Sequence, residues 1–230
     1  REHYPVALHA VGLNIAGSDP LDIDYLTALA SVYQQTEAAW LSDHLCWSAA
    51  DKRQHFDLLP FPFTKAMLDY LSPRIDQVQQ ALQRPLVLEN ISYYQRFQQD
   101  EMGEWDFTAE LMQRTGCQML LDLNNLWTNA TNFDLDPAAE LVTLHNAIKA
   151  DDIVQIHVAG SKHHPSANET DKGYWVDTHG EQVPPAVSAL LRACYEACGD
   201  IPTIIERDNN LPDFTELESE RRALADSVYE

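Results

Sequence analysis

The sequence predicts an α/β fold of the TIM-type (β/α)8 barrel class, and three observations lead to this prediction. Short apolar runs alternate along the chain with segments whose apolar residues recur at helical spacing. The runs are almost unbroken, as in parallel strands covered by helices. No G-x-G-x-x-G motif follows the early runs, so a dinucleotide-binding sheet has no support. A barrel needs eight strands and fewer are found, so we expect the first strand to lie before Arg1.

Local patterns justify the individual elements. Asp19 and Pro20 suit a helix start, and the segment 65–82 places apolar side chains on one helical face. Gly116 and Gly199 each follow a helical segment as a stop residue. Strands are expected at 6–13, 39–47, 85–89, 118–123, 153–158 and 203–206, with a short seventh at 174–179. Helices are expected at 21–35, 65–82, 104–114, 137–150, 184–198 and 216–229.

Length and composition favour one barrel domain over residues 1–230, with no internal repeat or flexible linker. The 15 Lys and Arg against 36 Asp and Glu give a net charge of −21, which repels nucleic acid and anionic membranes. No apolar run is long enough to span a bilayer. The four cysteines contain no C-x-x-C pair, so we expect free thiols and a cytoplasmic location.

Polar residues that can bind metal ions stand at the ends of the apolar runs. In a parallel barrel these ends meet at one mouth. Carboxylates buried together repel one another and lose hydration, and metal cations remove that penalty. We therefore expect a metal site with more than one ion. The residues that the expected strand ends carry are His9, Asp43, His44, Glu89, Asn90, Asp122, Asn124, Asn125, His157, Asp177, His179, Glu206 and Asp208.

Taken singly, these residues have ordinary structural explanations. His9 suits a hydrogen-bonded core histidine, Glu89 an ion-pair member, and Asp122 and Asn125 helix caps or turn formers. His163-His164 is expected in a solvated loop. The repetition of the pattern in every strand favours the metal site over these explanations. Imidazole and carboxylate ligands without thiolate suit iron, manganese or zinc, and ligand type alone leaves that choice open.

A set of motifs in fixed order resembles the multinuclear non-haem iron-dependent oxidative enzyme (MNIO) family, formerly catalogued as a domain of unknown function. The resemblance extends from about residue 6 to residue 208. The motifs are Leu8-His9, Ser42-Asp43-His44-Leu45-Cys46-Trp47-Ser48, Asp57-Leu58-Leu59-Pro60, Leu88-Glu89-Asn90, Thr115-Gly116-Cys117, Leu121-Asp122-Leu123-Asn124-Asn125, Ile156-His157-Val158-Ala159-Gly160, Asp177-Thr178-His179-Gly180 and Ile205-Glu206 with Asp208.

The resemblance implies a (β/α) barrel that binds two or three iron ions and uses dioxygen as co-substrate. It implies a ribosomally synthesised precursor peptide as substrate, modified at cysteine, and a small partner protein that presents the peptide. Asp208 is a candidate catalytic residue for orientation or proton transfer, and Asp43 is expected to be structural. The implied metal ligands are His9, His44, Glu89, Asp122, Asn125, His157, Asp177, His179 and Glu206.

Two positions depart from the family pattern, and at a third the resemblance disagrees with strand alternation. Ser161 stands where family members often have His, and Arg207 stands where Trp commonly follows the last Glu. Strand alternation from Asp122 would direct Asn124 inward, whereas the resemblance selects Asn125. We expect these positions to affect contacts around the ligands and the polarity of the pocket.

Two other functions remain open. A divalent-metal TIM-barrel isomerase or hydrolase, as in the xylose-isomerase-like proteins, uses the same His, Asp and Glu ligands. A non-catalytic module that binds metal or peptide would also carry them. Oxygen consumption and peptide mass shifts separate these alternatives from an oxidase.

Overall fold

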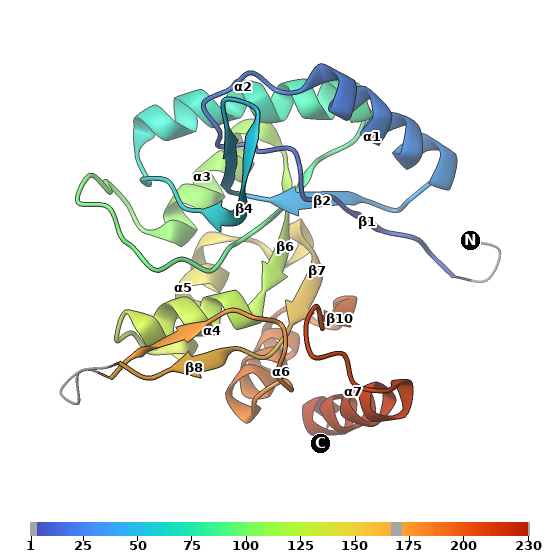
Figure 1. Ribbon diagram of the computed structural model, residues 1–230, viewed down its shortest axis with the longest axis vertical. Coiled ribbons are helices and arrows are strands. Elements are labelled where there is room, and N and C mark those ends of the chain that lie inside the picture. Colours follow the sequence, from blue (N-terminus) through green and yellow to red (C-terminus); the bar gives the residue numbers. More distant parts are fainter. Residues whose placement is uncertain (1–3, 167–171, 230) are drawn as a thin grey trace. The chain divides into compact units, whose positions relative to one another are not determined.

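The structure is a computed structural model that describes residues 4–166 and 172–229 (Figure 1). The chain divides into two compact units, residues 1–120 and residues 121–230. The expected single domain over residues 1–230 remains a prediction. Of the helices within the described ranges, none has the length and apolar character that a bilayer crossing requires.

Four parallel strands form the sheet of the first unit, in the order β1-β2-β5-β6. The register places His9 opposite Ser42, and His44 opposite Glu89. Because parallel strands end at the same edge, this register brings His9, His44 and Glu89 together. The strands are β1 (Leu8–His9), β2 (Leu41–His44), β5 (Val87–Glu89) and β6 (Gln118–Asp122).

Helices α1 (Ile23–Thr36), α2 (Lys65–Leu82) and α3 (Glu104–Thr115) pack in sequence, α1 on α2 and α2 on α3. The Asp22 side chain accepts a free N–H in the first turn of α1, and Thr64 does the same for α2. The buried core of this unit contains Leu41, Leu68, Leu71, Ile75, Val78, Leu86, Val87, Phe107 and Leu111.

A β-hairpin that the sequence did not predict follows β2. Strands β3 (Trp47–Ala50) and β4 (Arg53–Leu59) pair antiparallel and form a separate two-stranded sheet. The two turn residues, Asp51 and Lys52, have φ angles of 50° and 61°. Positive φ at both turn positions gives the backbone twist that a two-residue hairpin requires.

The second unit contains the parallel pair β7 (Ile153–Val158) and β10 (Thr203–Ile205), in which Ile204 lies opposite His157. Its buried core includes Leu123, Leu144, Ile156, Val158, Val187 and Leu191. The helices are α4 (Leu123–Asn132), α5 (Pro137–Ala147), the short 3-10 helix η1 (Ala150–Asp152), α6 (Pro185–Cys198) and α7 (Phe214–Tyr229) (Figure 1).

The expected seventh strand at 174–179 was wrong as a barrel strand. Strand β9 (Tyr174–Val176) pairs antiparallel with β8 (Lys162–His164) in a separate hairpin. His163 and His164 are exposed as expected, but they lie in β8 and not in a loop. Asp177 and His179 therefore follow a hairpin strand, and helix α4 was also not predicted.

Candidate metal centre

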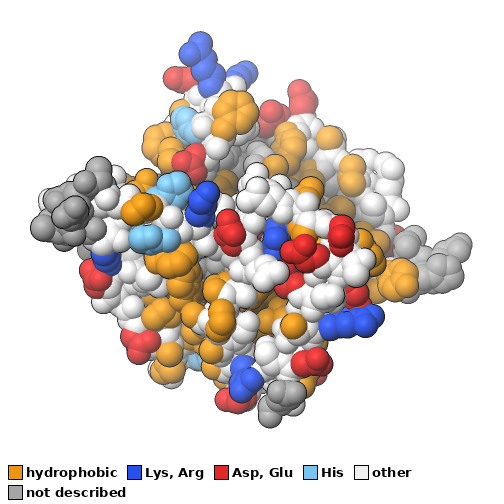
Figure 2. Space-filling model, turned by 60° about the horizontal axis from the view of Figure 1, so that its bottom comes forward, with side chains coloured by type: hydrophobic (Ala, Val, Ile, Leu, Met, Phe, Trp, Pro, Cys, Tyr) orange, Lys and Arg blue, Asp and Glu red, His pale blue; other side chains and the backbone are white. Residues whose placement is uncertain are grey.

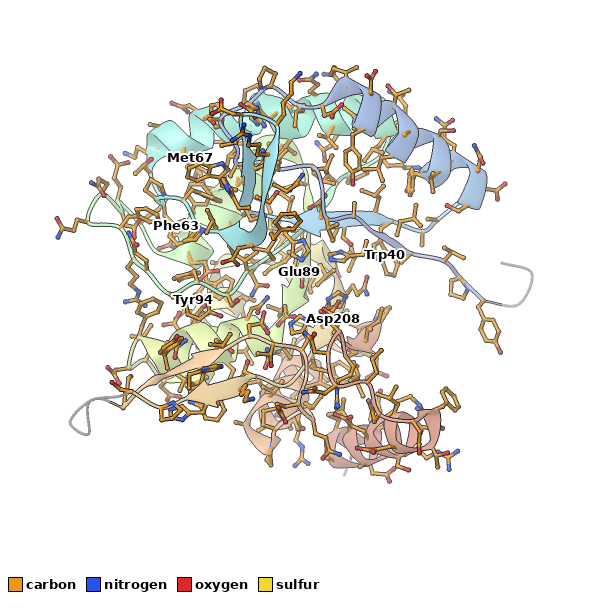
Figure 3. All side chains as sticks on the ribbon, viewed as in Figure 1. Trp40, Phe63, Met67, Glu89, Tyr94 and Asp208 are labelled. Carbon is orange, nitrogen blue, oxygen red and sulfur yellow. The ribbon has the colours of Figure 1, made fainter. Side chains whose placement is uncertain are left out.

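Two imidazoles and one carboxylate converge at the strand ends of the first unit. The Nε2 atoms of His9 and His44 lie 3.3 and 3.5 Å from Oε2 of Glu89. The two rings meet edge to face with centroids 4.7 Å apart. Glu89 is only 2% exposed and is labelled in Figure 3. One ligand atom from each residue lies within 4.8 Å of those of the other two, so the three can share one cation.

Neighbouring polar groups orient these ligands. Nδ1 of His9 lies 2.8 Å from the Ser42 hydroxyl, which itself donates to the Leu8 carbonyl. Nδ1 of His9 is therefore the donor to Ser42, and in the neutral ring the lone pair on Nε2 faces Glu89. Two acceptors face one another in this way only with a proton or a metal ion between them. The buried Asp43 carboxylate accepts the backbone N–H groups of Leu13 and His44, a positioning role.

A second group of predicted ligands lies at the strand ends of the second unit. Nδ1 of His157 lies 3.1 Å from Oε1 of Glu206. Asp122, His157 and Glu206 each offer a ligand atom within 4.8 Å of those of the other two. Asp122 also caps α4, because its Oδ1 accepts the Asn125 N–H at 2.6 Å. Asp122 therefore both caps α4 and lies beside His157 and Glu206.

His179 is held among carboxylates. Its Nε2 lies 2.8 Å from Asp177, and its Nδ1 lies 3.2 Å from both Glu206 and Asp208. Burial alone lowers the pKa of His179, but the Asp177 hydrogen bond and the charges of Asp177, Asp122 and Glu206 raise it to about 10. The cluster therefore holds a positive charge at His179 even without a metal ion.

The backbone at His179 is also unusual. Its φ of 47° lies in the left-handed region, which is sparsely occupied by residues with a side chain. Its carbonyl accepts the N–H groups of Asp208 and Asn209. Left-handed residues of this kind concentrate at functional sites, where surrounding contacts maintain them. Here the contacts come from the loop that carries Asp208.

A buried hydrogen-bond network orients Asp177. The Asn124 amide donates to Oδ1 of Asp177 at 2.7 Å and to the Ser161 hydroxyl at 3.0 Å. Ser161 also contacts the Thr128 hydroxyl at 2.8 Å. Asn124 is buried and contacts a predicted ligand, but it lies in helix α4, so strand alternation from Asp122 does not explain its direction. Asn125 is buried beside Asp122, and its position as a ligand remains a prediction.

Gln155 is a site residue that sequence reasoning missed. It lies two residues before His157 on β7, and its side-chain amide is 3.0 Å from Nε2 of His157. Gln155 is buried. The Gln155 amide nitrogen donates to Nε2, so in the metal-free neutral ring Nδ1 carries the proton and faces Glu206. A metal ion on Nδ1 would place the ring proton on Nε2, and the amide would then turn its carbonyl oxygen to accept it. A buried Gln on the same strand face as His157 was the available signal.

Replacing Gln155 with leucine is expected to weaken metal binding at His157 by about 10–100-fold, because the ring loses the contact that orients it. Gln155→Glu keeps an acceptor for the Nε2–H and is expected to restore most of the affinity. The measurement is competition for bound metal against a chelator of known affinity. Equal affinity in the leucine variant and the parent would contradict this role.

The donor atoms fit metal ions in both units. Two atoms each about 2.1 Å from a metal are about 3.0 Å apart at a right angle and about 3.4 Å apart at the tetrahedral angle. The distances from the rings of His9, His44 and His157 to the nearest carboxylate oxygen of Glu89 or Glu206 are 3.1 to 3.5 Å. In the second unit, four carboxylates (Asp122, Asp177, Glu206 and Asp208) surround two imidazoles. Negative charge remains even with both rings protonated, and a metal cation offsets it.

Arg207 does not join the ligands. Its guanidinium pairs with Glu220 of α7 at 2.6 Å, and the two side chains are only 7% and 8% exposed. Glu220 also accepts the Val183 N–H. The Arg at the usual Trp position therefore joins α7 to the segment after β10.

Comparison with known proteins identifies the family. Residues 1–228 match the profile described as "RiPP precursor modification enzyme MbnB/TglH/ChrH". The chain belongs to the MbnB/TglH/ChrH family. The expected MNIO resemblance is thereby confirmed. A UPF0276 protein of Anaeromyxobacter sp. (strain Fw109-5) is 42% identical over 227 residues, which are 98% of this chain and 76% of that protein. A UPF0276 protein of Acaryochloris marina is 38% identical over 96% of this chain and 76% of its own length.

Solved structures confirm the predicted fold class of this MbnB/TglH/ChrH family member. Endonuclease IV from Thermus thermophilus superposes with a TM-score of 0.64 at 15% identity, covering 98% of this chain and 76% of that one. A xylose isomerase domain containing protein from Salmonella typhimurium gives a TM-score of 0.60 at 11% identity, covering 97% and 75%. Neighbours of this kind are xylose-isomerase-like TIM barrels, and at these identities the likeness concerns the fold alone.

Proposed function

We propose that this chain is an iron-dependent oxidase that uses dioxygen to modify a ribosomally synthesised precursor peptide at a cysteine. Membership of a precursor modification family supports the substrate class. The observation that carries the metal chemistry is the excess of carboxylates over imidazoles around His179 and Glu206. A small partner protein that presents the peptide is part of the proposal, as is a reducing cytoplasm, which suits the four free cysteines.

Nine residues would hold two or three iron ions in this proposal: His9, His44, Glu89, Asp122, Asn125, His157, Asp177, His179 and Glu206. Bound iron supplies electron transfer and reaction with dioxygen, which protein side chains cannot supply. The chain's own groups fix the ligand atoms. Ser42 orients His9, Gln155 orients His157 and Asn124 orients Asp177.

Asp208 is proposed to handle a proton at the edge of the site. Its Oδ2 lies 3.2 Å from Nδ1 of His179, and its side chain is 70% exposed. An exposed carboxylate at this distance can take the Nδ1 proton and pass it to solvent. The Nε2–H, which lies 2.8 Å from Oδ1 of Asp177, then keeps the ring in place.

The test is anaerobic reconstitution with ferrous ion, followed by exposure to dioxygen with a cysteine-containing precursor peptide and its presenting protein. We expect oxygen consumption and a peptide mass shift that a Cys→Ser peptide does not show. An unchanged peptide mass with iron bound would contradict the proposed oxidase and favour a metal-binding or peptide-binding module. The same mass shift under strict anaerobiosis would contradict the role of dioxygen.

The runner-up is a divalent-metal isomerase or hydrolase, because the ligand types suit that chemistry as well. A nuclease activity is disfavoured by the net charge of −21, which repels a phosphate backbone. On the face of the molecule that Figure 2 shows, Asp and Glu side chains lie among the Lys and Arg side chains. Interconversion of ketose and aldose sugars by the manganese-loaded or magnesium-loaded chain, with no peptide oxidation, would favour the isomerase.

A further inference from the structure

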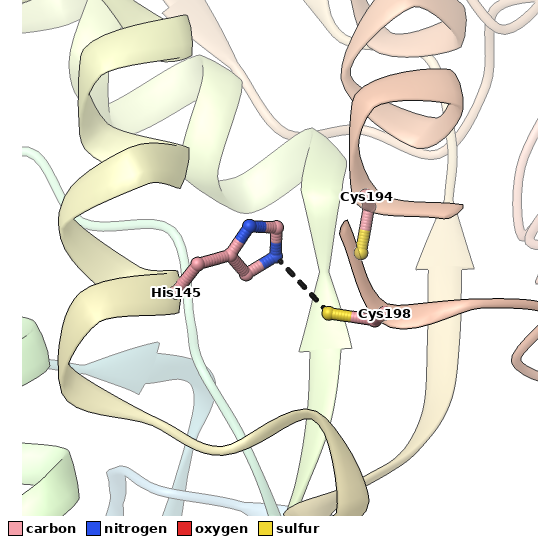
Figure 4. A group of neighbouring side chains, drawn as sticks. All are labelled: His145, Cys194 and Cys198. Atoms are coloured by element: carbon pink, nitrogen blue, oxygen red, sulfur yellow. Dashed lines mark hydrogen bonds between the residues drawn. The ribbon is translucent and has the colours of Figure 1, made fainter. Parts of the chain in front are cut away.

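Three side chains of metal-ligating types lie close together on the helices of the second unit (Figure 4). His145 is near the end of α5, and Cys194 and Cys198 are in the last turns of α6. Nε2 of His145 lies 3.5 Å from Sγ of Cys198, and the ligand atoms of all three residues lie within 4.8 Å of one another. The C-terminal ends of α5 and α6 come before the first residues of β7 and β10. His157 is near the last residue of β7, and Glu206 directly follows β10, so the two groups belong to opposite ends of these strands.

The two thiols are not placed for a disulfide. Cys194 and Cys198 are four residues apart on one helix, where Cβ atoms are about 5–6 Å apart. A disulfide needs Cβ atoms about 3.5–4.5 Å apart, so the helix would have to unwind. Both thiols are free in the structure. The spacing instead directs two sulfur ligands from one helix face toward His145.

We propose that His145, Cys194 and Cys198 form a zinc site that is separate from the strand-end ligands. At Zn–S and Zn–N distances of about 2.3 and 2.1 Å, tetrahedral geometry places sulfur and nitrogen about 3.6 Å apart. The observed separation of 3.5 Å matches this value. The same geometry places two sulfurs about 3.8 Å apart, inside the 4.8 Å limit that the group meets.

The donor types select the cation class. Two thiolates and one imidazole suit the borderline-soft zinc ion, whereas the carboxylate-rich strand ends suit harder ions. Cys194 is fully buried, while Cys198 and His145 are partly exposed. Solvent can therefore reach the fourth coordination position from the side of Cys198 and His145.

A reactive-thiol role fits the surroundings less well. Nucleophilic cysteines lie in electropositive places that lower their pKa. Here burial raises the pKa of both thiols, that of Cys194 to about 12. A zinc ion at this position would link α5 to α6, two helices that already pack against each other. Zinc bound only to the folded chain would raise its resistance to unfolding.

The experiment titrates the chain of residues 1–230 with Co²⁺, which replaces zinc and reports sulfur ligands by thiolate-to-cobalt charge-transfer absorption. The strand-end ligands are nitrogen and oxygen only, so iron-site binding cannot produce this band. We expect the band in the parent chain and its displacement by Zn²⁺. We expect its loss in Cys194→Ala and Cys198→Ala, and at least about tenfold weaker Co²⁺ binding in His145→Ala.

Matched controls come from the other two thiols. Cys46→Ala and Cys117→Ala remove buried sulfurs of the first unit and are expected to keep the band. The partly exposed Cys198 can be replaced with little effect on packing, which keeps the test valid if Cys194→Ala is unstable. Absence of the band in the parent, or its survival in Cys198→Ala, would overturn the proposal. Neither result depends on whether the chain oxidises peptides.

Discussion

Glu89→Gln is expected to empty the iron site of the first unit and to abolish peptide modification. One oxygen of Glu89 faces both His9 and His44, at 3.3 and 3.5 Å. Glutamine keeps the size of the side chain but removes the negative charge that balances a cation between the rings. We expect metal affinity at this group to fall by more than about 100-fold, because loss of a ligand exceeds loss of a supporting contact. Iron content after dialysis against a chelator and peptide mass spectrometry provide the measurements.

The matched control is Glu110→Gln on α3. Glu110 is partly exposed and pairs with Arg114 at 2.9 Å, an interaction worth about 0–1 kcal/mol. We expect this variant to keep the parent's iron content and activity. Full iron content and full activity in Glu89→Gln would contradict the assignment of Glu89 as a ligand.

Glu206→Gln is expected to empty the site of the second unit with a comparably large loss of activity. Its two oxygens face different imidazoles, Oε1 toward His157 at 3.1 Å and Oε2 toward His179 at 3.2 Å. In the metal-free protein the same change should lower the pKa of His179 from about 10, because Glu206 is one of the charges that hold the proton there. The measurements are iron content and an NMR titration of the His179 ring.

The control for this change is Glu196→Gln, which removes an exposed carboxylate on α6. We expect it to leave iron content, activity and the His179 titration unchanged. An unchanged His179 pKa together with normal iron content in Glu206→Gln would show that Glu206 does not act on these rings.

The parallel strands and most helices were predictable because apolar periodicity determines them. All six expected strands are present, and helix α2 spans Lys65–Leu82 as predicted. Its apolar face, with Leu68, Leu71 and Ile75, is fully buried. For these elements the burial that stabilises the fold produces the same pattern that the sequence displays.

Elements that lack this pattern were missed. The β3–β4 hairpin turns at Asp51-Lys52, which lacks the glycine that usually marks positive φ. Helix α4 begins at Leu123, directly after β6. It contains Asn124 and Asn125, residues of low helix propensity, in its first turn and is stabilised by its Asp122 cap. Strand β8 is polar and exposed on every residue, so its pairing with β9 leaves no apolar signal.

The grouping of the predicted ligands could be foreseen from the sequence, and the contacts around them could be foreseen less well. The ends of parallel strands gather at one edge, which is why His9, His44 and Glu89 could be grouped from sequence alone. Ser42 and Gln155 contact the rings of His9 and His157. These contacts depend on strand register and side-chain direction, about which the apolar pattern carries no information.

The most direct test of the central claim is anomalous diffraction at the iron absorption edge from crystals of the chain loaded anaerobically with ferrous ion. We predict iron peaks bound by His44 and Glu89 in the first unit and by His157 and Glu206 in the second. Maps without iron at either group, from crystals in which these side chains are well ordered, would contradict the claim that the strand-end residues are metal ligands.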